Sequence, residues 1–474
     1  MMRRNLAFYS LLVMFITVLM KISGLLSKIV ITKYLSPLEY GILTFVTISL
    51  PLMFQFVTNL SFFNLLSHSK KGKHYFKFSL FYVILSCAVI IALFYIFLDK
   101  ILTMFEISPD YAQITFLTFS LLLFPMSVSV VLMGLFRGLR KYSVATITSS
   151  LPTFLKFVFI AILAVTLQKL TLNLTILATV ISTWVALLAI VAYEWQTIKS
   201  SIHTKYFLPK LDMFLFSLSI FTVGSYGTLL QIIGRLIIAY DIDVTYQGYL
   251  DISITLMTLL SIPMIALSFL TIPEATSANT KEELLTGEIN DVARLLLSIL
   301  VFLVIIVSIY PHELIMFLFS SKYSPAAEYV VFLAVGSIFM FIQQFIAYVE
   351  ISFYETLSEY RPFVIFTIAC LVLFLATTHI LVILFGFIGV YVSNLLFKVV
   401  YFAGSLKVSS KKTAKIFLTK IERLTISTVA TISFLLVTKG TLNFIFEIAI
   451  AAIIFTLLVV KTKYFDLRKL LYSL

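Results

Sequence analysis

The sequence of 474 residues carries little charge, because Asp, Glu, Lys and Arg together make up only 12% of it. A soluble domain has about twice this charged fraction, so the composition excludes a soluble globular protein. Cysteine is also scarce: Cys87 and Cys370 are too few for a disulfide framework or a metal site, and we expect them to pack as small apolar side chains. A phosphate-binding glycine loop, zinc-ligand spacing and a Ser-His-Asp set are missing, so we expect no cofactor, no metal and no use of ATP.

Long apolar segments fill most of the sequence, which is 61% hydrophobic with a mean hydropathy of +1.08. Each segment is apolar for about 20 residues, the length of a helix that crosses a bilayer. Strands of a membrane barrel would instead alternate apolar and polar residues. The sequence therefore predicts an all-α polytopic membrane protein with fourteen transmembrane helices, at 6–31, 41–66, 78–98, 113–136, 143–167, 174–195, 212–238, 249–273, 293–310, 328–352, 362–383, 387–406, 424–438 and 442–460.

Positive charge is unevenly distributed between the predicted loops. With a cytoplasmic N-terminus, most of the 35 Lys and Arg fall in cytoplasmic segments and five fall in external loops. Basic residues resist translocation, so this bias predicts that both termini are cytoplasmic. It also accounts for the net charge of +13 without a nucleic-acid partner. Every predicted loop has about 20 residues or fewer, too few for a soluble catalytic domain, so we expect a protein that is not an enzyme.

A weak internal repeat appears when the sequence is shifted by 207 residues. Gly41 then aligns with Gly248, and Lys28 aligns with Arg235. In each stretch a helix with a late cation is followed by a short polar turn and by a glycine that opens the next helix. Six predicted helices precede residue 212 and six follow it, so the two halves have parallel topology. We predict an N-lobe of helices 1–6, a C-lobe of helices 7–12, and two further helices with a basic cytoplasmic tail, over residues 1–211, 212–407 and 408–474.

Five cations lie inside the predicted membrane spans: Lys21, Lys28, Lys156, Arg235 and Lys398. A cation in hydrocarbon is costly and usually faces a water-filled cavity or the interior of the helix bundle. Lys21 and Lys28 are seven residues apart, so they share one face of a helix, about 10 Å apart along its axis. Lys28 and Arg235 lie late enough in their helices to reach the interface by snorkelling, which is an alternative. For Lys156 and Lys398 the alternative is an interhelical ion pair.

Buried acids are fewer than buried cations. We count Glu350 and Glu447 as the carboxylates available inside the membrane, against five cations. This surplus predicts an anionic ligand, and phosphate or pyrophosphate fits because ammonium and guanidinium groups both bind phosphate oxygens. Amide side chains inside the spans are weaker candidates for contacts to sugar or to a cavity, and interhelical hydrogen bonds are their alternative role. These amides are Gln55, Asn59, Gln231, Gln343 and Asn394.

The first helix and the turn after it carry a family resemblance. From Gly24 to Gly41 the chain reads Gly-Leu-Leu-Ser-Lys-Ile-Val-Ile-Thr-Lys-Tyr-Leu-Ser-Pro-Leu-Glu-Tyr-Gly. This resembles the opening of the polysaccharide flippases, within the multidrug/oligosaccharidyl-lipid/polysaccharide exporter superfamily. Lys33 stands where arginine is common, and Ser36 stands where glycine is common. The run Gly138-Leu-Arg-Lys-Tyr142 is similar to the internal loop that follows helix 4 in that family.

The resemblance implies two lobes around a central cavity that opens alternately to the two sides of the membrane. It implies a flippase that moves a lipid-linked oligosaccharide, on a polyprenyl phosphate or pyrophosphate, from the cytoplasmic to the outer leaflet of the cell membrane. Expected partners are this substrate and membrane lipids, with glycosyltransferases or a polymerase of the same pathway as candidates. Coupling to Na⁺ or H⁺ is left open.

Three other functions stay as alternatives. A drug exporter of the same superfamily would be expected to bury acids and aromatic residues for its cationic substrates, whereas this cavity is predicted to be basic. A membrane enzyme acting on lipid-linked sugars usually needs a large external loop, and the predicted external loops are short. A scramblase or a structural protein would tolerate neutralisation of the buried cations.

Overall fold

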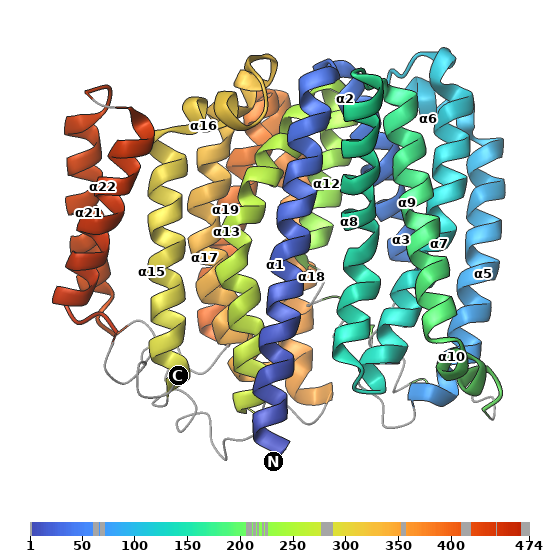
Figure 1. Ribbon diagram of the computed structural model, residues 1–474, viewed down its shortest axis with the longest axis horizontal. Coiled ribbons are helices and arrows are strands. Elements are labelled where there is room, and N and C mark those ends of the chain that lie inside the picture. The colour runs from blue at the N-terminus through green and yellow to red at the C-terminus, as the bar shows by residue number, and fades with distance from the viewer. Residues whose placement is uncertain are drawn as a thin grey trace. The chain divides into compact units, whose positions relative to one another are not determined.

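The computed structural model describes residues 2–59, 66, 72–204, 226–275, 288–351, 357–408, 419–441 and 443–465, with isolated positions between 211 and 222. Within these ranges every regular element is a helix, as predicted (Figure 1). In the same part of the chain, 12 helical segments are long and apolar enough to cross a membrane. The chain is therefore a multi-pass membrane protein.

The chain divides by packing into two compact units. The first comprises residues 1–251 and 371–390, and the second comprises residues 252–370 and 391–474. This division does not follow the predicted lobes, whose boundaries remain a prediction. The first unit contains α1 (Met2–Tyr34), α2 (Pro37–Thr44), η1 (Phe45–Ser49), α3 (Leu50–Asn59), α5 (Gly72–Ile96), α6 (Leu98–Met104), η2 (Pro109–Tyr111), α7 (Ala112–Gly138), α8 (Tyr142–Leu167), α9 (Leu172–Tyr193), α10 (Trp195–Ile202) and α12 (Tyr226–Asp241).

Three helices contribute to both units. The first turns of α13 (Thr245–Ala275), the second half of α18 (Leu357–Phe385) and the first turn of α19 (Phe387–Val408) belong to the first unit, and the rest of each belongs to the second. The remaining elements of the second unit are α15 (Glu288–Ile309), α16 (Pro311–Leu318), η3 (Ser321–Ala326), α17 (Ala327–Ile351), α21 (Ile421–Thr438) and α22 (Phe444–Lys461).

The predicted spans coincide with these helices to within a few residues over most of the chain. The spans predicted at 212–238 and 249–273 correspond to α12 and α13, which are not among the 12 candidate spans, and much of 212–225 lies outside the described residues. Fourteen transmembrane helices and cytoplasmic termini therefore remain predictions. The short helices α6, α10 and α16 follow membrane spans and were not predicted, because each is too short to show a clear periodicity.

The second predicted span is built from three segments. Ser36 caps α2: its hydroxyl accepts the backbone N–H of Glu39, and the Glu39 carboxylate accepts the backbone N–H of Ser36. Pro37 occupies the first turn, where its missing N–H costs nothing. The α-helical pattern then gives way to the five π-helical residues of η1 before α3 begins. Such π-helical insertions are frequent at functional sites.

A proline inside α7 is compensated by a neighbouring helix. Pro125 has no N–H to donate to the carbonyl of Leu121, four residues earlier. The indole Nε1–H of Trp184, on α9, donates to that carbonyl at 2.8 Å. In hydrocarbon an unpaired carbonyl costs several kcal/mol, roughly, so this bond both satisfies α7 and joins it to α9.

Polar contacts join α21 and α22 to the end of α15 in the second unit. The hydroxyl of Tyr310 donates to the buried carboxylate of Glu447, on α22, at 2.5 Å. Lys439 donates to the carbonyl of Ile309 at 2.6 Å and lies over the ring of Tyr310. Glu447, counted from the sequence as a carboxylate available inside the membrane, accepts this tyrosine hydroxyl because α22 packs beside α15.

The pairing of Pro125 with Trp184 makes a testable prediction. Trp184→Phe removes the indole donor and leaves the Leu121 carbonyl unpaired, so we expect a loss of about 1–3 kcal/mol in unfolding free energy. In a Pro125→Ala background the restored N–H satisfies that carbonyl, and Trp184→Phe should then cost much less. Thermal unfolding of the four variants in detergent measures this coupling. An equal loss in both backgrounds would contradict the compensation.

Candidate functional site

Asp251, in the first turns of α13, gathers the polar groups at the centre of the candidate site. Its side chain is 1% exposed. One carboxylate oxygen accepts Nζ of Lys28 at 2.7 Å and the hydroxyl of Tyr40 at 2.6 Å, and the other accepts Nη2 of Arg235 at 2.6 Å. A buried carboxylate is costly without such partners, and two cations with one hydroxyl satisfy it.

Two sequence-based expectations are corrected by this cluster. The count of two buried acids is wrong, because Asp251 also lies inside a predicted span and is buried. Snorkelling is wrong for Arg235, which is 2% exposed, and for Lys28, whose ammonium binds Asp251 instead of reaching an interface. Both cations are thus held inside the first unit, which agrees with the prediction that a cation in a span faces a cavity or the interior of the helix bundle.

The residues of the family-like motif position this cluster. The capping box at Ser36 and Glu39 fixes the start of α2, and this sets the direction in which Tyr40 projects toward Asp251. Gly41 follows, where α2 packs against the backbone of Val244 and Thr245 at the start of α13. A Cβ on Gly41 would overlap the carbonyl of Val244, so a glycine is required for the two backbones to meet.

The contact between these helices follows the internal repeat. Gly41 lies against Val244, and its repeat-related Gly248 lies against Pro37, where an added Cβ would be 2.9 Å from the proline carbonyl oxygen. Pro37 and Val244 are themselves 207 residues apart. The two halves of the repeat therefore meet through equivalent residues on both sides. Lys28 and Arg235, also equivalent, share the single carboxylate of Asp251.

A second layer of hydrogen bonds supports Arg235. The side-chain amide of Gln247 donates to the backbone carbonyl of Arg235, and its oxygen accepts the hydroxyl of Ser49 at 3.2 Å. Ser49 ends the π-helical segment η1, so this irregular stretch touches the site directly. Gln247 thereby links α12 to η1 by hydrogen bonds.

Donors on Arg235 remain available around this network. Its Nε and Nη1 groups are buried and have no hydrogen-bond partner among the described residues. Unpaired buried donors are rare in native structures and call for an explanation. Arg235 thus offers the single N–H of Nε and the two of Nη1 to a ligand while Nη2 stays on Asp251.

Lys21 and Lys156 surround the same cluster without joining it. Lys21 interacts electrostatically with Lys28, and Lys156 interacts with both Lys28 and Asp251. Neither lysine makes a hydrogen bond or ion pair with a residue that the structure describes. Four basic side chains therefore lie around the single carboxylate of Asp251 in this part of the first unit, and the site carries an excess of positive charge.

Lys156 also lines a polar pocket of about 280 Å³ within the first unit. Eight of the 15 lining residues are Ser or Thr. Seven of these hydroxyls donate to carbonyls of their own helices, which leaves their oxygens as acceptors; they belong to Thr47, Ser129, Thr148, Ser149, Thr179, Ser182 and Thr183. The pocket thus combines many acceptors with one cation.

The weaker polar candidates fall in different surroundings. Gln55 lines the same pocket and donates to the carbonyl of Met126 at 3.2 Å, which is the interhelical role given as its alternative. Gln231 is exposed, one turn before Arg235. Gln343 is buried on α17. The side chains of Asn59 and Glu350 lie outside the described residues.

Lys398 belongs to the second unit. Its side chain runs along Gly336 of α17, where an added Cβ would be 2.7 Å from Cδ of the lysine. One turn earlier on α19, Oδ1 of Asn394 is buried and has no hydrogen-bond partner among the described residues. No described acid pairs with Lys398, so the alternative of an interhelical ion pair finds no partner among the residues that the structure describes.

The second family-like motif, Gly138–Tyr142, forms the tight turn between α7 and α8. Arg140 adopts a left-handed backbone conformation, with φ of 60°, which turns the chain sharply after α7. Lys141 then donates to the carboxylate of Glu194 at 2.5 Å and to the hydroxyl of Thr197 at 2.8 Å. Burial raises the pKa of Glu194, but the hydrogen bonds with Lys141 and Thr197 outweigh it and hold that pKa below its ordinary value.

Comparison with known proteins identifies the fold. No known family profile matches the sequence, and no curated protein matches it. A solved structure of the lipid II flippase MurJ, in an inward closed conformation, is 16% identical over 96% of this chain and 99% of that chain, with a TM-score of 0.72.

Multidrug transporters share this fold. The MATE multidrug transporter DinF-BH is 15% identical over 88% of this chain and 97% of that chain, with a TM-score of 0.60. An inward-facing MATE transporter of the MOP superfamily is 15% identical over 85% of this chain and 96% of that chain, with a TM-score of 0.58. The chain therefore has the fold of these membrane transporters, as its resemblance to that superfamily predicted.

Removal of the shared carboxylate should be costly. Asp251→Asn removes the carboxylate that Lys28 and Arg235 share, so we expect a loss of about 3–5 kcal/mol in unfolding free energy. Asp99→Asn, an exposed acid in the first turn of α6, is the matched control and should change stability by less than about 0.5 kcal/mol. Unfolding in detergent measures both, and equal effects would contradict the assigned role of Asp251.

Glu194 should give a pH-dependent contribution to stability. Because its pKa is lower in the folded state than the ordinary value of 4.5, its stabilisation is complete above that value and is lost as the pH falls through the folded pKa. Glu194→Gln should therefore lower the unfolding temperature at pH 7, and the difference from the native chain should shrink below about pH 4.5. A difference that grows on acidification would contradict this sign.

Proposed function

We propose that this chain is a flippase that moves a saccharide linked to a polyprenyl phosphate or pyrophosphate from the cytoplasmic to the outer leaflet of the cell membrane. The observation that carries the proposal is the excess of buried positive charge around Asp251. Its support is twofold: the fold matches that of a solved lipid II flippase, and Lys21 and Lys156 make no ion pair with a residue that the structure describes. Alternating access between the two sides of the membrane would carry the head group across.

Asp251 prepares the site for an anion. By pairing with Lys28 and Arg235 it fixes both groups in place in a region where unpaired charges are costly. An incoming phosphodiester carries one negative charge and a pyrophosphate diester carries two, so either can compete with Asp251 for the same two groups. Nε and Nη1 of Arg235 are ready to donate to its oxygens, and charge-assisted bonds to phosphate are strong.

Lys21 and Lys156 extend the positive region around this pair. Their charges offset the cost of dehydrating a second phosphate group or of passing the anion along the helix. Lys398, with the amide oxygen of Asn394 one turn earlier on α19, stays a candidate phosphate contact within the second unit. A membrane potential that is positive outside also favours outward movement of an anion, by about 2.3 kcal/mol per charge per 100 mV.

The polar pocket beside Lys156 is suited to sugar hydroxyls. Its wall oxygens are acceptors, because their protons already bind helix carbonyls, and sugar hydroxyls can donate to them. Its volume of about 280 Å³ lies just below the range for ligand sites, roughly 300–1,000 Å³. Gln55 belongs to this wall, while Asn59, Gln231 and Gln343 stay weaker candidates for sugar contacts. Glycosyltransferases or a polymerase of the same pathway are the proposed protein partners.

Transport measurements in liposomes test the proposal. We expect the reconstituted chain to move a polyprenyl pyrophosphate-linked sugar across the bilayer, measured as its protection from an external modifying reagent. Lys156→Met should slow this transport about tenfold or more, because it removes an unpartnered cation whose loss costs little folding energy. Lys33→Met, which removes an exposed cation at the end of α1, is the control and should leave the rate unchanged.

A neutral glycolipid that carries the same sugar separates the phosphate site from a general scramblase. We expect it to cross slowly, and at the same rate in the native chain and in Lys156→Met. Equal transport of the anionic lipid in native, Lys28→Met and Lys156→Met proteins would contradict a role for the cations.

A further inference from the structure

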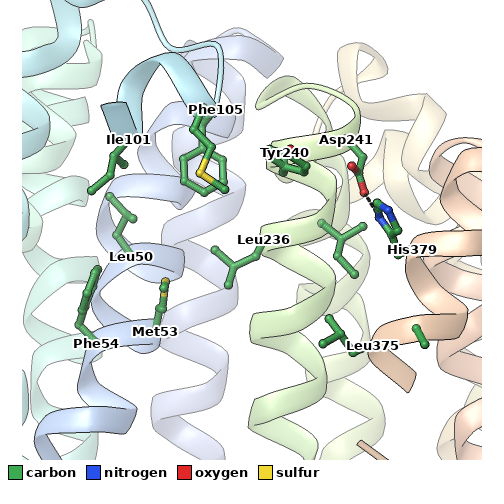
Figure 2. A pocket seen from close by; sticks show the side chains of 13 residues that line it. Leu50, Met53, Phe54, Ile101, Phe105, Leu236, Tyr240, Asp241, Leu375 and His379 are labelled. Atoms are coloured by element: carbon green, nitrogen blue, oxygen red, sulfur yellow. Dashed lines mark hydrogen bonds and ion pairs between the residues drawn. The ribbon is translucent and has the colours of Figure 1, made fainter. Parts of the chain in front are cut away.

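A second pocket in the first unit lies apart from the cation cluster. It has a volume of about 470 Å³ and lies between α3 and α6 on one side and α12 and α18 on the other (Figure 2). Apolar side chains form its walls, and Figure 2 shows Leu50, Phe54 and Leu236 among them. Asp241 and His379 lie together at one end of this pocket.

Side chains of the walls are open to the surroundings of the protein. Met53, Met104 and Leu375 are 38%, 51% and 51% exposed. In a membrane-spanning chain such exposed apolar groups are suited to contact with hydrocarbon, and an apolar pocket does not favour water. Contact with a hydrocarbon chain is favourable here, because it fills space that would otherwise lack van der Waals partners.

Acceptors are concentrated where Asp241 meets His379. Nδ1 of His379 lies 2.9 Å from Oδ2 of Asp241, and an ionised carboxylate can only accept, so Nδ1 carries the proton. In the neutral ring Nε2 is then an acceptor as well, and the ring is 51% exposed. Among the described residues no donor reaches Oδ1 of Asp241. The end of the pocket therefore presents acceptors to a ligand.

The carboxylate of Asp241 and the acceptor nitrogen of His379 favour some lipid head groups over others. A primary ammonium has a positive charge for Asp241 and three N–H donors to share between Oδ1 and Nε2. A choline group has the charge but no N–H donor. A glycerol head group has no cation, and its phosphate would meet the carboxylate of Asp241. A prenyl pyrophosphate would be repelled for the same reason, so this pocket is distinct from the proposed substrate site.

We infer that this pocket binds an aminophospholipid, with a hydrocarbon chain between α3 and α12 and its ammonium group on Asp241 and His379. The predicted orientation places this end of α12 on the outer side, so the lipid belongs to the outer leaflet. Bound there, it would join α3 and α6 to α12 and α18 within the first unit and stabilise their packing. The inference does not depend on what the chain transports.

Lipid add-back to the delipidated full-length chain tests this inference. Phosphatidylethanolamine should raise the unfolding temperature by about 4 °C more than phosphatidylcholine or phosphatidylglycerol with the same acyl chains. Asp241→Asn should abolish this preference while keeping the general effect of lipid. Glu106→Gln, an exposed acid next to the pocket residue Phe105, is the matched control and should keep the preference.

A pocket-filling variant tests the hydrocarbon part separately. Leu236→Trp should reduce phosphatidylethanolamine retained in native mass spectra, whereas Leu177→Trp, on the exposed face of α9, should not. Ala376→Leu narrows the pocket with a smaller side chain and should act in the same direction if Leu236→Trp fails to fold. Equal stabilisation by all three lipids, or an unchanged preference in Asp241→Asn, would overturn the inference.

Discussion

The site depends on one buried carboxylate that two cations share. Asp251 holds Lys28 and Arg235 in place and is itself acceptable inside the protein because of them. A buried cation without this carboxylate would cost more free energy than the shared arrangement does. The capping box, the glycine contacts of α2 with α13, and the Gln247 bridge all serve to bring these three groups within hydrogen-bonding distance.

The shared carboxylate also gives the internal repeat an asymmetry. Lys28 and Arg235 are equivalent under the shift of 207 residues, and so are the glycines that pack beside them. Asp251 has no such equivalent, since the corresponding position holds Thr44. One acid therefore serves two related cations, and the pair keeps a net positive charge. An anionic ligand complements this residual charge without requiring either cation to lose its proton.

Much of the architecture could be predicted from the sequence. Apolar runs located the helices, and the repeat pointed to Lys28, Gly41, Arg235 and Gly248, which the structure brings together. The role of Asp251 was missed because its pairing with Lys28 and Arg235 depends on which helices pack together. A carboxylate near the end of a predicted helix is also usually assigned to the membrane interface. The contact of Glu447 with Tyr310 could not be predicted for the same reason, because it depends on tertiary packing. The π-helical segment has no periodicity that a sequence pattern could show, and the Asp241–His379 pair joins residues 138 positions apart.

The central claim is that an anionic head group competes with Asp251 for Lys28 and Arg235. Infrared difference spectra of the reconstituted chain, recorded as a short-chain prenyl pyrophosphate is added, report on this carboxylate directly. The account predicts a shift of a carboxylate band that is absent from Asp251→Asn, because Asp251 loses charge-assisted bonds when the ligand binds. Saturable binding with an unchanged carboxylate spectrum would show that the anion binds elsewhere and would contradict the account.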